Sequence, residues 1–271
     1  MKSDIVSIKT NHTASAKLYT YLLDNSPEID INRERPLVLI CPGGGYEFTS
    51  DREAEAVAVR YLAKGFHACV LRYSAAPAEF PFALCELAVS VSYLRERAKE
   101  FGINKDKIIV AGFSAGGHLA ASLGIFWDKE WLTGETGLTC DKIKPNGLIL
   151  SYPVITSGKF AHAGSFRNLM GKKASPELEK LLSLENQVTS AVPPVFIWHT
   201  FTDTAVPVQN SLLFAEALVN NNVSVELHIF PKGGHGLSLA DEETSVKKSG
   251  FGIEKRCQDW MELSCKWVSD L

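Results

Sequence analysis

The segment 107–126 changes character at its centre, and this change constrains the fold more than any other feature of the chain. Residues 107–111 form an apolar, β-branched run, residues 112–116 read Gly-Phe-Ser-Ala-Gly, and an Ala/Leu-rich segment follows. This pattern predicts a strand, a sharp turn and a buried helix. In such a turn the central residue, Ser114, has a strained backbone and projects its side chain beyond the end of the sheet. Ser114 is therefore a candidate nucleophile.

Further apolar runs surround this segment and have the length and continuity of strands buried in a parallel sheet. Two shorter runs near the N-terminus predict an antiparallel edge. Apolar residues at helical spacing occupy most of the intervals, whereas residues 127–143 look irregular. Strands that alternate with helices predict an α/β fold, with a mainly parallel sheet of about eight strands and helices on both faces. The expected strands are residues 5–9, 16–22, 36–41, 66–71, 107–111, 147–152, 194–199 and 225–230.

The length and composition suit one domain over residues 1–271. A chain of 271 residues with 45% hydrophobic residues can bury a full α/β core. Residues 153–193 lie between two expected strands and contain one clear helix start, with Ser175 as N-cap. We expect this interval to form a small cap-like insertion over the sheet.

Charge and apolar patterning exclude several classes of partner. The net charge is −3 and no basic block occurs, so neither nucleic acid nor an anionic membrane is an expected partner. No run of 18 apolar residues is present and the first ten residues lack an apolar signal core, which predicts a cytoplasmic protein. The six cysteines are scattered without a C-x-x-C pair, and we expect them to be reduced and mostly buried.

Two residues late in the chain have the chemistry that a serine nucleophile requires. A serine hydroxyl needs an imidazole to accept its proton and a carboxylate to orient that imidazole. Asp203 follows the expected strand 194–199, and His235 follows the strand 225–230 in a glycine-rich loop. An acid after a late strand and a histidine in a later loop is the order that this kind of site has. Because such a histidine must be neutral to act as a base, we predict a rate that falls as the pH drops through about 6 to 7.

A glycine-rich loop after the strand 36–41 supplies the remaining element of such a site. The oxygen that becomes negative during acyl transfer needs backbone N–H donors. One donor is expected from Ala115, at the start of the predicted helix, and the other from Gly44 or Gly45. The same glycines match neither a dinucleotide-binding nor a P-loop pattern, so nucleotide binding is not expected. Acyl transfer by a serine needs no cofactor or metal, and none is expected. Tyr46, next to this loop, is a candidate lining residue of the substrate pocket.

These motifs together resemble the α/β-hydrolase superfamily. Within it, the chain is similar to bacterial carboxylesterases of the hormone-sensitive-lipase-like and acetyl-xylan-esterase-like groups, over about residues 37–236. The resemblance implies that Ser114 is the nucleophile, Asp203 the acid and His235 the base. It also implies a small-molecule ester as substrate, with acetylated sugars as the preferred class. The motifs that carry the resemblance are the Gly-Gly-Gly-Tyr of residues 43–46, residues 112–116, Asp203 with the Val-Pro of 206–207, and the Gly-His-Gly of 234–236.

The sequence departs from many members of these groups at Pro42, where they have a histidine before the three glycines. The choice between Gly44 and Gly45 as oxyanion donor therefore stays open. The number of subunits is also open, and a homo-oligomer is allowed.

Each candidate has a structural alternative. Ser114 could be an ordinary turn serine, Asp203 an N-cap before the helix near residue 208, and His235 an exposed loop residue. The remaining candidates are interpreted as structural: His118 and His199 as hydrogen-bonded packing residues, His162 as a surface residue, and Trp127 and Trp131 as packing residues rather than a sugar platform.

The sequence thus predicts a serine carboxylesterase that hydrolyses short, preferably acetyl, esters of sugars or xylo-oligosaccharides through an acyl-enzyme. A peptidase or an arylformamidase on the same scaffold is the alternative within the hydrolases. The alternative from another class is a non-catalytic binding protein that has kept the fold.

Overall fold

The computed structural model describes residues 1–13 and 15–271, and an eight-stranded sheet forms its centre. The strand order is β1-β2-β4-β3-β5-β6-β7-β8. The strands β4, β3, β5, β6, β7 and β8 are parallel, while β1 and β2 form an antiparallel edge, as predicted. The strands are β1 (Lys2–Ser7), β2 (Lys17–Leu22), β3 (Arg35–Cys41), β4 (His67–Arg72), β5 (Ile103–Phe113), β6 (Gly147–Ser151), β7 (Val195–Thr200) and β8 (Val225–Phe230).

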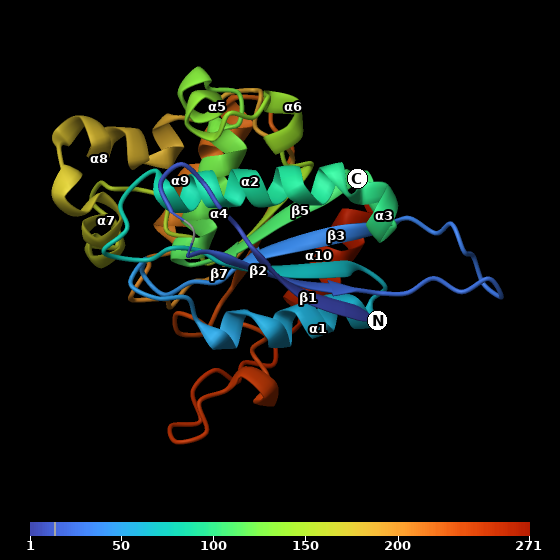
Figure 1. Ribbon diagram of the computed structural model, residues 1–271. Coiled ribbons are helices and arrows are strands. Elements are labelled where there is room, and N and C mark those ends of the chain that lie inside the picture. The colour runs from blue at the N-terminus through green and yellow to red at the C-terminus, as the bar shows by residue number, and fades with distance from the viewer. Residues whose placement is uncertain (14) are drawn as a thin grey trace.

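Helices cover both faces of this sheet, and each face has its own apolar core. On one face Leu37 and Leu39 of β3 belong to the core that also contains α2 and α4; on the other, Val38 and Ile40 belong to the core with α1 and α10. Figure 1 shows α2 and α4 above the sheet and α1 below it. The helices are α1 (Glu55–Ala63), α2 (Phe82–Glu96), α3 (Ala98–Phe101), α4 (Ala115–Phe126), α5 (Glu130–Thr136), α6 (Cys140–Ile143), α7 (Ala163–Met170), α8 (Pro176–Leu182), α9 (Gln209–Asn220) and α10 (Asp259–Asp270).

The strands of the sheet centre are continuous apolar runs because both of their faces are covered. All residues of β6 and β7 are buried, and so are residues 37–41 of β3. The edge strand β1 is exposed along almost all of its length. The α/β fold with a mainly parallel sheet, predicted from these runs, is therefore confirmed.

Three details of the sequence-based prediction are wrong. The interval 127–143 is not irregular, because it contains α5 and α6. The strand that leads to Ser114 starts at Ile103 rather than at residue 107, and its polar residues 104–107 lie beside a register shift between β3 and β5. Finally, β1 covers residues 2–7 instead of 5–9.

The interval 153–193 contains α7, α8 and two short 3-10 turns, and Figure 1 shows α7 and α8 beyond one end of the sheet. Ser175 caps α8 by accepting a hydrogen bond from the backbone N–H of Leu178 (3.2 Å), as predicted. The sequence missed α7, whose N-cap is His162.

The cysteines have the state that the sequence predicts. All six cysteines are free, and all except Cys140 are buried. In the described part of the chain, none of the helices combines the length and the apolar character that crossing a bilayer requires.

Candidate active site

Ser114 occupies the turn between β5 and α4 and has the strained backbone that this position predicts. Its φ is 53° and its ψ is −118°, which is an uncommon conformation for a residue with a side chain. The flanking glycines are required by close approach: a Cβ on Gly112 would collide with the carbonyl of Gly116, and one on Gly116 with the carbonyl of Cys41. The turn therefore packs tightly against β3 and directs the hydroxyl of Ser114 away from the core of the sheet.

The structure brings Ser114, His235 and Asp203 together in one hydrogen-bonded chain. The Oγ of Ser114 lies 2.7 Å from Nε2 of His235, and Nδ1 of His235 lies 2.6 Å from Oδ2 of Asp203. Asp203 follows β7 and His235 follows β8, so both loops leave the carboxyl ends of parallel strands, where Ser114 also lies. This geometry is the one that a nucleophile, a base and an orienting acid need.

The environment of Asp203 keeps its side chain ionised and fixed. Its side chain is fully buried, and Oδ1 accepts hydrogen bonds from the backbone N–H groups of Ala205 (3.0 Å) and Val206 (2.9 Å). Burial alone would raise the pKa of Asp203, but its contacts with His199 and His235 hold it below the ordinary range. Because an ionised carboxylate only accepts, Nδ1 of His235 must donate to it. Nε2 of His235 is then free to accept the proton of Ser114.

The oxyanion loop, residues 42–46, lies directly against the nucleophile. A Cβ built on Gly43 would lie 3.0 Å from Cβ of Ser114. The N–H of Gly43 donates to the carboxylate of Glu53 (2.8 Å), so it is turned away from the substrate side. Within residues 1–13 and 15–271, the backbone N–H groups of Gly44, Gly45 and Ala115 donate to no other backbone group. Their role as oxyanion donors stays a prediction.

A comparison with known proteins shows the family of this chain. The model of the BD-FAE family matches residues 26–218, which is well over half of the chain. The chain belongs to the BD-FAE family.

Two relatives of this BD-FAE chain are named as a xylanase and as an acetylxylan esterase. It is 36% identical to endo-1,4-beta-xylanase B of Butyrivibrio fibrisolvens over 230 residues, 83% of this chain and 35% of that protein. It is 30% identical to an acetylxylan esterase of Xylanibacter ruminicola over 204 residues, 73% of this chain and 40% of that protein. The chain thus spans two fifths or less of the length of these two relatives.

A solved structure aligns with nearly the whole of the BD-FAE chain. The acetyl ester-xyloside bifunctional hydrolase of Caldicellulosiruptor lactoaceticus is 37% identical, and the match covers 94% of this chain and 88% of that one with a TM-score of 0.78. The predicted resemblance to the esterases of the α/β-hydrolase superfamily is confirmed, and with it the predicted fold.

Tyr46, the residue predicted to line the substrate pocket, is buried by packing in the BD-FAE chain. It is 3% exposed, and its hydroxyl lies 3.0 Å from Nδ1 of His118. His118 is fully buried and its Nε2 donates to the carbonyl of Leu182 (2.9 Å), which confirms its interpretation as a packing residue. The contact of Tyr46 with a substrate stays a prediction, and most of its surface is already covered.

His162 is less exposed than the sequence indicated. Its ring is half-buried, and Nδ1 accepts hydrogen bonds from the backbone N–H (3.3 Å) and hydroxyl (2.8 Å) of Ser165 at the start of α7. Burial, and then the neighbouring charge of His235, lowers the pKa of His162. The predicted surface position is therefore incomplete, because this ring is half-buried at the N-cap of α7.

The two tryptophans that could have formed a sugar platform are packed instead. The indole N–H of Trp127 donates to the carbonyl of Ala191 (3.1 Å), and Trp131 packs against Phe126 and Phe80. Their interpretation as packing residues is confirmed.

Sequence reasoning missed two polar residues behind the site, Glu53 and Tyr152. The carboxylate of Glu53 is buried and accepts hydrogen bonds from Gly43 and from the hydroxyl of Tyr152 (2.6 Å). The ring of Tyr152 lies edge-on to the imidazole of His235, with 5.1 Å between centroids. Nothing in the sequence marks Glu53, since it is one of three acids in residues 51–55.

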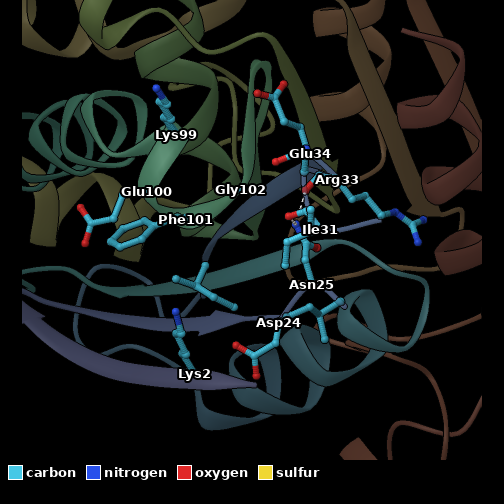
Figure 2. Close-up of a pocket in the computed structure, with 13 residues that line it drawn as sticks. Lys2, Asp24, Asn25, Ile31, Arg33, Glu34, Lys99, Glu100, Phe101 and Gly102 are labelled. Atoms are coloured by element: carbon cyan, nitrogen blue, oxygen red, sulfur yellow. Dashed lines mark hydrogen bonds between the residues drawn. The ribbon is translucent and has the colours of Figure 1, made fainter. Parts of the chain in front are cut away.

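A cavity of about 450 Å³ lies at the opposite end of the sheet from the triad. Figure 2 shows this cavity, lined by Asp24, Arg33 and Lys99 among others, from segments that precede β3 and β5. Ligands of open parallel sheets bind beyond the carboxyl ends of the strands, so the end with Ser114 is the better candidate site. Among the described residues, no group of three or more His, Cys, Asp or Glu side chains is arranged to hold a metal ion.

Proposed function

We propose that this protein is a serine esterase that hydrolyses short-chain carboxylic esters through an acyl-enzyme. The observation that carries the proposal is the unbroken hydrogen-bonded chain from Ser114 through His235 to Asp203, at 2.7 and 2.6 Å. Membership of the BD-FAE family and the named esterase relatives support the same chemistry.

In the first half of the reaction, Oγ of Ser114 attacks the ester carbonyl while its proton passes to Nε2 of His235. The carbonyl oxygen becomes negative and accepts hydrogen bonds from the N–H of Ala115 and of Gly44 or Gly45. Asp203 holds the imidazole and stabilises its charged form. When the tetrahedral intermediate collapses, the alcohol takes the proton from His235 and leaves.

In the second half, water attacks the acyl group on Ser114, with His235 again as the base. The acid leaves and the Ser114 hydroxyl is restored. No step of this cycle needs a cofactor or a metal ion.

The preferred substrates are acetyl esters of xylo-oligosaccharides or other sugars. The helix α7 is tied to the oxyanion loop, because the side-chain amide of Asn168 donates to the carbonyl of Gly45 (2.8 Å). The imidazole of His162, the N-cap of α7, suits a polar alcohol better than a lipid. The acetylxylan esterase and the acetyl ester-xyloside hydrolase among the relatives favour the same class.

We further propose that residues 1–271 act as one hydrolase domain and that residues 153–193 form its small cap. The interval contains α7 and α8, and α7 contacts the oxyanion loop directly.

A panel of substrates tests the proposal. The protein should hydrolyse p-nitrophenyl acetate and acetylated xylo-oligosaccharides, and Ser114→Ala should abolish both activities. Faster hydrolysis of the palmitate ester than of the acetate would contradict the short-acyl preference. Preference for an aminoacyl amide or for formylkynurenine would replace the esterase by a peptidase or an arylformamidase, and no turnover of any of them would favour a binding protein.

A further inference from the structure

Glu53 is a buried acid, and each of its two carboxylate oxygens accepts a hydrogen bond. It is 4% exposed and ends a short 3-10 turn, Asp51–Glu53, between the oxyanion loop and α1. Oε2 accepts from the N–H of Gly43 (2.8 Å), and Oε1 accepts from the hydroxyl of Tyr152 (2.6 Å). A buried carboxylate is costly to desolvate, and an apolar residue of similar size would fill this space at lower cost. Stability alone therefore does not explain an acid at this position.

The hydrogen bond from Gly43 to Glu53 connects the carboxylate to the segment next to the nucleophile. The backbone of Gly43 lies close to Ser114, because a Cβ built on Gly43 would lie only 3.0 Å from Cβ of Ser114. The same Cβ would lie 2.7 Å from Oε2 of Glu53. By accepting the N–H of Gly43, Glu53 fixes the orientation of the Pro42–Gly43 peptide group, at the start of the loop that carries Gly44 and Gly45. Their N–H groups are the ones left to face a substrate.

The hydrogen bond from Tyr152 to Glu53 connects the carboxylate to the loop that carries His235. The hydroxyl of Tyr152 accepts a hydrogen bond from the N–H of Ser238 (2.9 Å), three residues after His235. Because that N–H already donates to the Tyr152 oxygen, the hydroxyl proton points to Glu53. Tyr152 and Ser238 both have positive φ, 38° and 55°, a conformation that persists only where the surroundings hold it.

We propose that Glu53 is a positioning residue that sets the oxyanion loop and the His235 loop relative to each other. It acts through Gly43 on one side and through Tyr152 and Ser238 on the other, and it does not touch the substrate. The inference rests on the proposed function, because it concerns the geometry of that reaction. Since the oxyanion forms only during the reaction, an error in this geometry lowers kcat more than it raises KM.

The test compares Glu53→Gln with the wild type and with Glu55→Gln in the hydrolysis of p-nitrophenyl acetate. Gln has the shape of Glu, but only its carbonyl oxygen can accept a hydrogen bond. Either the N–H of Gly43 or the hydroxyl of Tyr152 therefore loses its acceptor. We expect kcat to fall about 10- to 100-fold, part of the loss that removal of an oxyanion donor causes, with KM changed less than about twofold. Glu55 is exposed on α1, two residues away, and Glu55→Gln should keep the wild-type kcat.

A second variant separates positioning from folding. Tyr152→Phe keeps the ring and removes only the hydroxyl, and we expect it to lower kcat in the same way. If the two residues act as one unit, the double variant should lose hardly more activity than Glu53→Gln alone. Wild-type kcat in a folded Glu53→Gln protein would overturn the inference; if that variant does not fold, wild-type kcat in Tyr152→Phe would do so. A wild-type protein without any esterase activity would instead overturn the proposed function, and this inference with it.

Discussion

Nε2 of His199 lies 3.4 Å from Oδ2 of Asp203, the same oxygen that accepts the hydrogen bond from His235. The shorter contact of His199 Nε2 is to the carbonyl of Val206 (2.9 Å), and its Nδ1 lies 2.7 Å from the hydroxyl of Ser211. The interpretation of His199 as a hydrogen-bonded packing residue is confirmed, and the structure adds its contact with the acid. Asp203 is thus held from two sides, and its orientation toward His235 is fixed before substrate binds.

Replacement of this acid should remove most of the activity without unfolding the protein. In Asp203→Asn the amide can donate where the carboxylate accepted, which favours the wrong tautomer of His235. We expect kcat to fall about 10³- to 10⁴-fold. Asp241→Asn is the matched control, because Asp241 pairs with Arg60 and takes no part in the triad. An Asp203→Asn variant with more than a tenth of wild-type kcat would argue against the assigned role.

The two candidate glycines of the oxyanion loop should respond differently to substitution. Gly44 has φ of 127°, and a Cβ there would collide with the carbonyl of Phe48. Gly45 has φ of 65°, and its Cβ would meet only the hydroxyl oxygen of Ser165, at 3.9 Å. We therefore expect Gly44→Ala to lower kcat about 100-fold and Gly45→Ala to lower it less than about tenfold.

The control for both is Gly134→Ala, since a Cβ on Gly134 has no described atom within 4 Å. This variant should retain wild-type kcat. Steady-state rates on p-nitrophenyl acetate check all three, and a larger loss in Gly45→Ala than in Gly44→Ala would contradict the description of the loop.

The central strands and the triad could be predicted from the sequence because their signals are local. Strands such as β6 and β7 are covered on both faces and are therefore unbroken apolar runs, and Asp203 and His235 follow such strands at short distances. The helices α5 and α6 could not be predicted, since each is short and buries a single residue, Leu132 or Ile143.

The connections behind the site could not be predicted for another reason. Glu53 contacts Tyr152, which is 99 residues away, and only the folded sheet brings them together. In sequence, a buried carboxylate is indistinguishable from the surface acids beside it. The N-cap of α7 was missed because it is His162, whereas Ser, Thr, Asp and Asn are the residues that normally mark a helix start.

Stability should depend on pH through His118. Burial lowers the pKa of this histidine from its ordinary value of 6.5 to about 4. Between these values the unfolded chain binds a proton there that the folded protein does not, so the free energy of unfolding decreases as the pH falls through this window. We expect this group to contribute a loss of about 2 to 3 kcal/mol between pH 7 and pH 4.5.

Urea unfolding of the wild type and of His118→Gln at both pH values measures this contribution. The variant starts from a lower stability but should lose about 2 to 3 kcal/mol less on acidification. His228→Gln, which changes a ring on the edge strand β8 with 28% of its side chain exposed, should keep the wild-type difference. An equal pH dependence in the wild type and His118→Gln would contradict the neutral, buried state of His118.

The most direct test of the account is the covalent labelling of Ser114 by an organophosphonate, followed by intact mass spectrometry and peptide mapping. The account predicts one added phosphonyl group per chain, on Ser114, with no labelling of Ser114→Ala and strongly slowed labelling of a folded His235→Ala variant. Absence of labelling in the folded wild-type protein, or a label on any other residue, would contradict it.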